Sequence, residues 1–393
     1  MIARTWDTLG DSPSLLGFGC MRFPLKDPAD PASIDVPAAR ELIRRAWEGG
    51  VNYFDTAWPY HGGRSEAFLG EALGEFPRDS YYLATKIPTW EVIRSRRDAE
   101  EIFSQQLERC RTDHFDFYLM HNLNRQNFEN VQKIGLFDLL ARKKDEGKIR
   151  HIGFSFHDTP AMLERIVDTY PWDFAQIQLN YLDWTLLDAK KQYEILHGHH
   201  IPVAVMEPVR GGMLARVDSD SAALMRQAAP ARSQASWALR FAASLPGVMV
   251  VLSGMGSMEQ VHDNLETFEH FAPLDAAECR LLEQVAENLK KVGAIPCTGC
   301  RYCADCPQGV NIPKIFAIYN QFCMRKEPVF FRNDYRTIPE EEQAHHCIQC
   351  GFCEAHCPQR IPIIRTLREI DQEAAPLLGR SAADAGSRSP GGG

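Results

Sequence analysis

Eight of the twelve cysteines stand in two short groups in the last quarter of the chain. The first group comprises Cys297, Cys300, Cys303 and Cys306, and the second comprises Cys347, Cys350, Cys353 and Cys357. A proline follows the last cysteine of each group. A [4Fe–4S] cluster needs four thiolate ligands, and a close run of cysteines ending in Cys-Pro is one way to supply them. The pattern therefore predicts two [4Fe–4S] clusters.

The fourth ligand of each cluster is expected to come from the other group, as in chains that hold two clusters. Cys357 would then join Cys297, Cys300 and Cys303, and Cys306 would join Cys347, Cys350 and Cys353. The second group has the required spacing residue for residue, whereas the first is one residue short before Cys306. Zinc is the alternative, because two Cys-x2-Cys pairs make a zinc site. Eight thiols in two groups favour clusters, and the scattered Cys20, Cys110, Cys279 and Cys323 are expected to be buried thiols.

A second set of reactive side chains follows three neighbouring strand-like segments. Asp55 ends the segment NYFDTA, Tyr60 lies in the loop after it, Lys86 ends YYLATKI, and His121 ends FDFYLMH. We expect Asp55 to pair with Lys86, whose ammonium group would lower the pKa of the Tyr60 phenol. His121 would donate a hydrogen bond to a carbonyl oxygen. These four residues predict a proton donor for an oxygen that becomes negative as hydride arrives at carbon.

The elements that would position these residues alternate along the chain. Strand-like runs begin near residues 15, 52, 81, 115, 151, 174, 201 and 247. Helical patterns lie between them, at 38–48, 65–73, 99–110, 131–146, 160–168, 188–197, 233–243 and 259–267. Eight such units in about 250 residues predict a (β/α)8 TIM barrel, in which active sites lie at the carboxyl ends of the strands. Residues 4–9 are expected to form a hairpin strand that closes the bottom of the barrel.

The rest of the chain predicts a smaller, mainly α-helical iron–sulfur domain of ferredoxin type. We place the barrel at residues 1–272, a connecting helix at 273–295 and the cysteine-rich domain at 296–371, with a helix at 313–322. Residues 372–393 include the low-complexity segment SAADAGSRSPGGG and are expected to be a disordered tail. The expected fold class is therefore α/β, a barrel followed by a small helical domain.

Composition narrows the class of protein. The chain has 393 residues and a net charge of −9, which argues against a general nucleic-acid binder and against a basic membrane-binding surface. No apolar stretch approaches the ~20 residues of a membrane-spanning helix, and the first ten residues lack a signal-peptide pattern. We expect a cytoplasmic protein.

The barrel segment resembles the aldo/keto reductases over roughly residues 4–270. The motifs that carry the resemblance are FDTAWPYHGGRSE, LATKI, FYLMHN, HIGFSF, FAQIQLNY and SGMGSMEQVHDNL. The resemblance implies carbonyl reduction with NADH or NADPH by Asp55, Tyr60, Lys86 and His121. The full chain is similar to the bacterial branch with a C-terminal ferredoxin-type domain.

The resemblance also implies residues that bind the nucleotide. Ser155 and Gln176 match positions near the nicotinamide carboxamide, and Met206 stands where a stacking aromatic residue is common. Arg210, Gly211 and Gly212 match the loop over the pyrophosphate. Family members that prefer NADP carry cations after strand eight, where this chain has Gly254, Gln260 and Asn264. We therefore expect NADH to bind at least as well as NADPH, unless Arg210 or Arg216 reaches the 2′-phosphate.

Three functions remain open from the sequence. The first is an oxidoreductase acting on a small carbonyl or alcohol, with iron–sulfur electron transfer and a possible redox partner protein. Its difficulty is that nicotinamides exchange two electrons and each cluster exchanges one. The second is a nucleotide-binding redox sensor with non-catalytic clusters, and the third gives the clusters a structural role only. Trp58, Trp90 and Trp184 would line an apolar substrate pocket or pack in the core.

Overall fold

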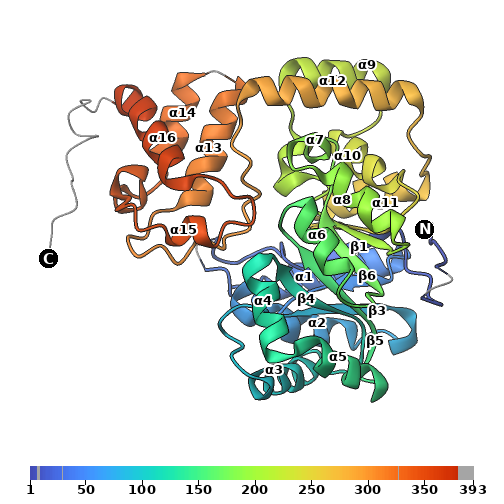
Figure 1. Cartoon of the computed structure of the whole chain (residues 1–393). Coiled ribbons are helices and arrows are strands. Elements are labelled where there is room, and N and C mark those ends of the chain that lie inside the picture. The colour runs from blue at the N-terminus through green and yellow to red at the C-terminus, as the bar shows by residue number, and fades with distance from the viewer. Residues whose placement is uncertain (7–8, 29, 326, 379–393) are drawn as a thin grey trace, which may run out of the picture. The chain divides into compact units, whose positions relative to one another are not determined.

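The computed structural model describes residues 1–6, 9–28, 30–325 and 327–378 (Figure 1). The chain divides into two compact units, which we describe separately. The first unit comprises Met1–Val209 and Ala235–Cys279, and the second comprises Arg210–Gln234 and the chain from Arg280 onward. The domain boundaries that the sequence suggests, at residues 272 and 295, stay predictions. The two compact units are a different division of the chain, since the second unit also includes residues 210–234.

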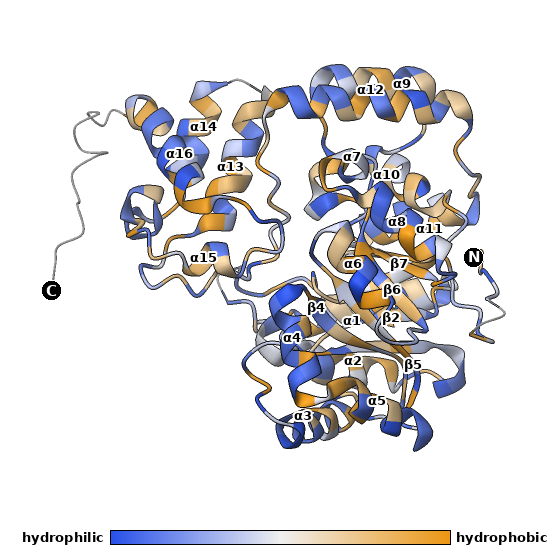
Figure 2. Cartoon of the chain, viewed as in Figure 1, coloured by the Kyte–Doolittle hydropathy of each residue, from blue (hydrophilic) through white to orange (hydrophobic). Residues whose placement is uncertain are grey.

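The first unit is a closed barrel of eight parallel strands, in which each strand pairs with the next and β8 pairs with β1. The strands are β1 (Leu16–Gly19), β2 (Tyr53–Asp55), β3 (Tyr82–Ile87), β4 (Phe115–Leu123), β5 (Ile149–Phe156), β6 (Phe174–Gln178), β7 (Val203–Met206) and β8 (Val248–Ser253). All eight coincide with the strand-like runs in the sequence, which confirms the predicted barrel. Strands buried on both faces read as continuous apolar runs, as β7 (VAVM) and the first five residues of β8 (VMVVL) do; Figure 2 colours the chain by hydropathy.

Helices surround the strands and bury their apolar faces against them. They are α1 (Val36–Glu48), α2 (Ser65–Leu73), α3 (Arg96–Arg109), α4 (Arg125–Ile134), α5 (Leu136–Asp145), α6 (Pro160–Val167), α7 (Asp183–Leu186), α8 (Ala189–Gly198), α10 (Gln234–Ala243) and α11 (Met258–Glu269). Short 3₁₀ turns η1 (Tyr60–Gly63) and η2 (Arg78–Ser80) follow β2 and α2. The single helix expected at 131–146 is wrong. Gly135 has a φ of +65°, a conformation that ends α4 and starts α5 in a new direction.

The N-terminal segment closes one end of the barrel. Ala3 pairs with Ser14 and Trp6 with Asp11 in antiparallel bridges, as a hairpin requires. Leu9 and Trp6 pack on the interior side chains Tyr53 and Phe117, which are the first residue of β2 and the third residue of β4. The carboxyl ends of the strands, where Asp55 lies, are therefore at the opposite end.

The second unit is helical and has its own hydrophobic core. Its elements are η3 (Arg210–Ala215), α9 (Ser219–Ala228), the greater part of α12 (Ala276–Val292), α13 (Ile312–Arg325), α14 (Pro328–Tyr335), η4 (Glu340–Glu342), η5 (Ala344–His346), α15 (Phe352–Ala355) and α16 (Ile363–Leu378). The core is formed mainly by apolar residues of α13, α14 and α16, such as Phe316, Tyr335 and Leu367. The helix expected at 313–322 is present as α13. Residues 372–378 are helical rather than disordered, and the remainder of the expected tail lies outside the described residues.

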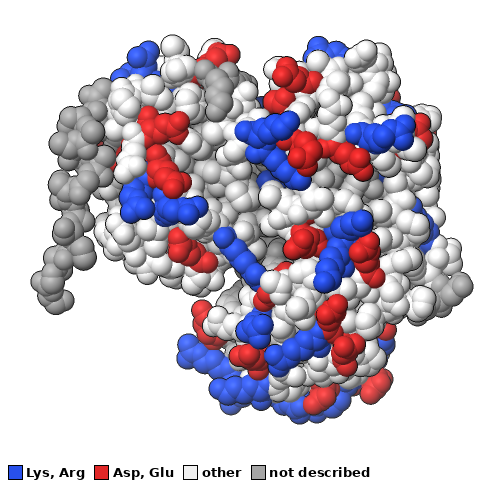
Figure 3. All heavy atoms as spheres, turned by 45° about the horizontal axis from the view of Figure 1, so that its top comes forward, with Lys and Arg blue, Asp and Glu red and all other residues white. Residues whose placement is uncertain are grey.

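Charged side chains of both signs alternate over the face that Figure 3 draws. Among the described residues, no helix is long and apolar enough to cross a membrane.

Candidate active site and cysteine cavities

Lys86 and Asp55 form a buried ion pair at the carboxyl ends of β3 and β2. Lys86 Nζ lies 2.5 Å from Asp55 Oδ1 and donates a second hydrogen bond to the Thr56 carbonyl oxygen at 2.8 Å. Lys86 is 1% exposed and Asp55 is 3% exposed. Among the described residues, none bonds the second carboxylate oxygen of Asp55. The pair is thus fixed in place, with its charges shielded from water.

Tyr60 and His121 complete the group that the sequence predicts. Tyr60 starts η1, in the loop after β2, and Lys86 Nζ lies 4.9 Å from the centre of its ring. The His121 ring stands almost perpendicular to the Tyr60 ring, with 5.8 Å between their centres. The structure therefore brings all four residues together at one mouth of the barrel.

The expected effect of Lys86 on the Tyr60 phenol is not found. Burial raises the pKa of Tyr60 well above its ordinary value, and the negative charges of Asp55 and Glu207 raise it further. The Lys86 ammonium faces the ring and is already paired with Asp55, so its charge does not offset burial. Tyr60 is consequently protonated at neutral pH and holds a proton that it can donate.

His121 is held in its neutral form. Burial lowers its pKa well below the ordinary value, and the nearby charge of Lys86 lowers it further. The centres of the Trp90 and His121 rings are 5.5 Å apart, so two aromatic side chains, Trp90 and Tyr60, lie next to His121. Trp184 instead packs against Phe241, as a core residue does. A neutral imidazole carries one N–H and can donate a hydrogen bond without a net charge.

Two residues expected near the nicotinamide lie side by side on neighbouring strands. Ser155 on β5 is in register with Gln176 on β6, and both are buried. Ser155 Oγ accepts a hydrogen bond from the Asn122 backbone N–H at 2.8 Å. Within the described part of the chain, nothing bonds the buried Gln176 Oε1. A buried amide oxygen with an open acceptor position fits the N–H group of a carboxamide. Met206 ends β7 nearby, in register with Gln178.

The residues expected after strand eight hold their own loop together. The Gln260 Oε1 atom accepts a hydrogen bond from the Gly256 backbone N–H at 2.8 Å. Asn264 is buried and donates to Ser253 Oγ at 2.6 Å. Both contacts tie the end of β8 to the first turns of α11. Neither side chain carries a charge that would attract a phosphate.

Arg22 is a cation beside this loop that sequence reasoning missed. It follows β1, and its side chain lies so close to Gly254 that a Cβ there would be 3.0 Å from Arg22 Cδ. Its guanidinium group forms an ion pair with Glu207 at 2.8 Å. Because β1 and β8 are neighbours in a closed barrel, a search of the loop after β1 would have found it.

Gly211 belongs to the second unit, together with Arg210 and Gly212. It has a φ of +64°, and a Cβ at this position would stand 2.3 Å from the Thr298 carbonyl oxygen. The structure thus gives Gly211 a packing role against the loop that carries Cys297.

The two cysteine groups line two cavities, each with about 330 Å³ of space free of protein atoms that is partly open to solvent. The first cavity is lined by Cys297, Cys300, Cys303 and Cys357. The second is lined by Cys306, Cys347, Cys350 and Cys353. Each cavity therefore contains three cysteines of one group and the last cysteine of the other, which is the exchange that the spacing predicts.

Each cavity is lined by a thiol that is difficult to deprotonate, because it is buried and close to other thiols. Burial raises the pKa of Cys303 to about 12, and its neighbours Cys300, Cys297 and Cys357 raise it as well. Burial and the neighbouring Cys347 raise the pKa of Cys353 to about 11. Thiols of this kind become thiolates together only when a metal cation compensates their charge. The donor set is therefore suited to a metal or a metal cluster and poorly suited to free thiolates.

The closed parallel barrel with its site at the carboxyl ends of the strands places the first unit among TIM-barrel proteins. The family model for the aldo/keto reductase family matches residues 15–287, and the chain belongs to that family. The model of a 4Fe-4S dicluster domain matches residues 296–361. The C-terminal region is therefore a ferredoxin-type iron–sulfur domain, which favours clusters over the zinc alternative.

Three proteins that the chain resembles cover between 64% and 74% of it. The oxidoreductase YqkF of Bacillus subtilis is 26% identical over 284 residues, 64% of this chain and 86% of its own length. L-galactose dehydrogenase of Arabidopsis thaliana is 25% identical over 74% of this chain and 95% of its own. The holo form of an aldo-keto reductase from Bacillus halodurans matches with a TM-score of 0.60 and 26% identity, over 72% of this chain and 96% of its own.

Proposed function

We propose that the barrel is the catalytic domain of an oxidoreductase that transfers hydride between NAD(P)(H) and a small carbonyl or alcohol. The observation that carries the proposal is the convergence of Tyr60, His121 and the buried Lys86–Asp55 pair at one mouth of the barrel. Membership of the aldo/keto reductase family supports it.

The nucleotide supplies the hydride when it is bound. Ser155 and Gln176 would hold its carboxamide group, because Gln176 Oε1 is a buried acceptor with an open position. Met206 would contact the ring through its thioether. Arg22, beside Gly254, adds a positive charge next to the loop after β8.

Tyr60 donates the proton that the substrate oxygen needs. Its phenol is protonated at neutral pH because burial raises its pKa. As the proton leaves, negative charge develops on the phenolate, and the Lys86 ammonium beside the ring stabilises it. Asp55 keeps Lys86 in position through the 2.5 Å contact. His121, which is neutral, donates a hydrogen bond to the substrate oxygen. In the direction of alcohol oxidation the same groups act in reverse.

The iron–sulfur domain would hold one [4Fe–4S] cluster in each cysteine cavity. A hydride carries two electrons and each cluster takes up one, so two clusters together match one hydride. The oxidised clusters would each accept one electron and the proton would go to water, and the reduced clusters would then pass the electrons to a redox partner protein. The cytoplasmic location expected from the sequence remains a prediction.

The test of catalysis is a screen of small carbonyls and alcohols with NADH and NADPH in parallel, on anaerobically purified protein. Tyr60→Phe is expected to lower turnover on the order of 10²–10⁴-fold, the contribution of a general acid, and to leave nucleotide binding intact. Tyr170→Phe is the control, because Tyr170 stacks on Phe137 in the outer layer of the barrel. Equal turnover in wild type and Tyr60→Phe would contradict the role of Tyr60.

The test of electron transfer is the absorbance of the clusters near 400 nm after NADH is added without oxygen. Bleaching is expected if hydride electrons reach the clusters. Carbonyl reduction without bleaching would place the clusters outside the catalytic path. Nucleotide binding with neither activity would favour the redox sensor instead.

A further inference from the structure

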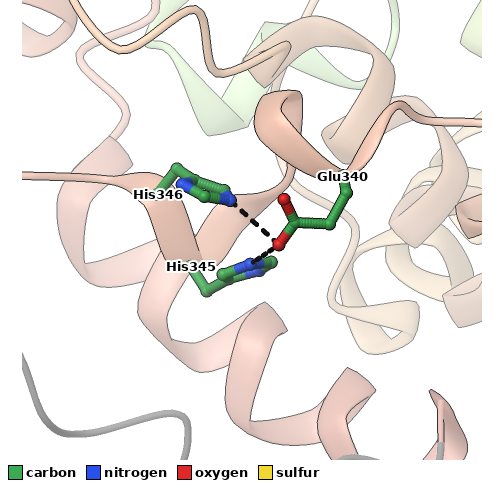
Figure 4. A group of neighbouring side chains, drawn as sticks. All are labelled: Glu340, His345 and His346. Atoms are coloured by element: carbon green, nitrogen blue, oxygen red, sulfur yellow. Dashed lines mark hydrogen bonds and ion pairs between the residues drawn. The ribbon is translucent and has the colours of Figure 1, made fainter.

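Three potential metal ligands outside the cysteine cavities converge on the surface of the second unit. Glu340 starts η4, and His345 and His346 end η5 (Figure 4). His345 Nε2 lies 2.8 Å from Glu340 Oε1, and His346 Nε2 lies 3.1 Å from the same oxygen. The three ligand atoms are all within 4.8 Å of one another. We propose that these residues bind a divalent transition-metal ion such as Zn²⁺.

The distances fit a metal with little rearrangement. Zinc binds imidazole nitrogen and carboxylate oxygen at about 2.0–2.2 Å, so two ligands of a tetrahedral site stand about 3.3 Å apart. The two N–O distances observed are therefore short of that separation by about half an ångström or less. A small rotation of the Glu340 side chain, which is 71% exposed, would open the space for an ion. Two imidazoles and one carboxylate leave a fourth position for water.

The chemistry of the two imidazoles also favours a metal. Their rings lie 4.3 Å apart with an interplanar angle of 42°, and both turn Nε2 toward Glu340 (Figure 4). On the other side of His345, the Nδ1 atom lies 4.0 Å from the carboxylate of Asp371, a residue of α16 that is 4% exposed. A carboxylate near Nδ1 favours a proton on that nitrogen, and in this tautomer Nε2 carries the lone pair with which an imidazole binds a metal.

The site is distinct from the cysteine cavities. None of its three residues lines either cavity, and all its ligand atoms are nitrogen or oxygen, which suit zinc, nickel or copper. His346 nevertheless precedes Cys347 in the chain. An ion bound here would therefore add positive charge next to the loop of the second cavity.

The experiment measures zinc on the full-length, anaerobically purified protein with its clusters in place. Zn²⁺ is added, unbound ion is removed by dialysis, and zinc, iron and sulfide are determined per chain. We expect one zinc to be retained with no loss of iron. His346→Gln and Glu340→Gln should each weaken zinc binding more than tenfold, since even residues that only orient metal ligands contribute 10–100-fold.

Two matched controls separate the site from general surface binding. His356 is an exposed histidine that also precedes a cluster-loop cysteine, and its Nδ1 contacts the Phe352 carbonyl oxygen. Glu341 is exposed and adjacent to Glu340. His356→Gln and Glu341→Gln should retain zinc as wild type does. Equal retention in all four variants, no retention in wild type, or zinc uptake that displaces iron would each overturn the proposal.

A second measurement needs no variant. Diethyl pyrocarbonate modifies accessible imidazoles, and mass spectrometry locates the modified residues. Added Zn²⁺ should protect His345 and His346 and leave the modification of His356 unchanged. Unchanged modification of His345 and His346 in protein that retains zinc would place the ion elsewhere.

Discussion

The Lys86–Asp55 pair is the residue-scale feature on which the barrel site depends. Both side chains are buried, and the charge of each is paired with the charge of the other. Removing one partner of such a pair is strongly destabilising, by about 3–5 kcal/mol, because the remaining charge stays buried. Variants at Asp55 or Lys86 therefore change stability as well as activity. Tyr60 and His121 are better probes of the chemistry because neither is part of this ion pair.

His121 gives the barrel a pH dependence whose sign follows from its lowered pKa. The unfolded chain takes up a proton on this residue near pH 6.5, whereas the folded barrel takes it up only at lower pH. Stability should therefore be fully present above about pH 6.5 and should fall as the pH drops below that value. We expect His121→Asn to lose part of this dependence.

The measurement is urea unfolding at pH values between 7.5 and 5, with tryptophan fluorescence as the signal of unfolding. All seven tryptophans lie in the first unit, so the signal reports on the barrel. His262→Asn on α11 is the control, because this histidine is exposed. The same loss of stability in wild type and His121→Asn would show that His121 is not the group responsible.

At the scale of elements, we expect the loop between β8 and α11 to lie next to the phosphate end of a bound nucleotide. Gln260 and Asn264 bond to this loop and carry no charge, and the nearby Arg22 is paired with Glu207. The uncharged loop explains the expectation that NADH binds at least as well as NADPH. If Arg22 binds the 2′-phosphate of NADPH, NADPH would bind more tightly than NADH and that expectation would be wrong.

Gln260→Arg should shift preference toward NADPH. A hydrogen bond between the new guanidinium group and the 2′-phosphate would contribute about 1.5–3 kcal/mol. Titration of both nucleotides against wild type and variant, by quenching of protein fluorescence, measures the shift. Glu259→Arg adds more positive charge to the exposed neighbouring position and serves as the control. A comparable shift in Glu259→Arg would attribute the effect to general electrostatics.

The cysteine loops permit a test of which thiols share a cluster. If Cys300 and Cys357 hold the same cluster, the double variant Cys300→Ala with Cys357→Ala should keep about four of the expected eight irons. Cys350→Ala with Cys357→Ala should then lose nearly all iron, because each substitution removes a ligand of a different cluster. Iron and sulfide analysis distinguishes the two outcomes. The reverse result would mean that each loop binds its own four-cysteine cluster.

How much the sequence predicts varies with the kind of signal. The eight strands are mainly apolar runs that recur along the chain, and the cysteine exchange follows from the spacing of the cysteines. Both features could therefore be predicted from the sequence. The break at Gly135 interrupts a helical pattern that continues on either side, and only its positive φ shows where the direction changes. The pKa of Tyr60 depends on its burial and on the charges of Asp55 and Glu207 around it, and a sequence does not show these distances. The Arg22–Gly254 contact required knowledge of which strands close the barrel.

At the scale of the whole molecule, the chain has two units with separate cores. The barrel buries a large apolar cluster, whereas the second unit surrounds two cavities lined by thiols. The iron–sulfur domain should therefore depend on its metal far more than the barrel does.

Removal of iron should unfold the second unit selectively. A chelator with a reductant is expected to lower the helical circular dichroism signal and to leave the tryptophan emission of the barrel unchanged. Zinc refilling of the cavities is prevented by working in metal-free buffer. A shift of the tryptophan emission together with the loss of iron would show that the barrel depends on the clusters too.

The exchange of one cysteine between the two cavities has a consequence for the order of events during protein synthesis. The ribosome makes Cys297, Cys300 and Cys303 first, but the cavity that they line is closed by Cys357, which is made 60 residues after Cys297. The other cavity receives Cys306 early and its remaining three thiols only from Cys347 onward. Neither cavity has its four thiols until the second loop has been translated. Cofactor insertion into this domain must therefore await the translation of Cys357, which follows the whole barrel segment in the chain, and the barrel has time to fold before it.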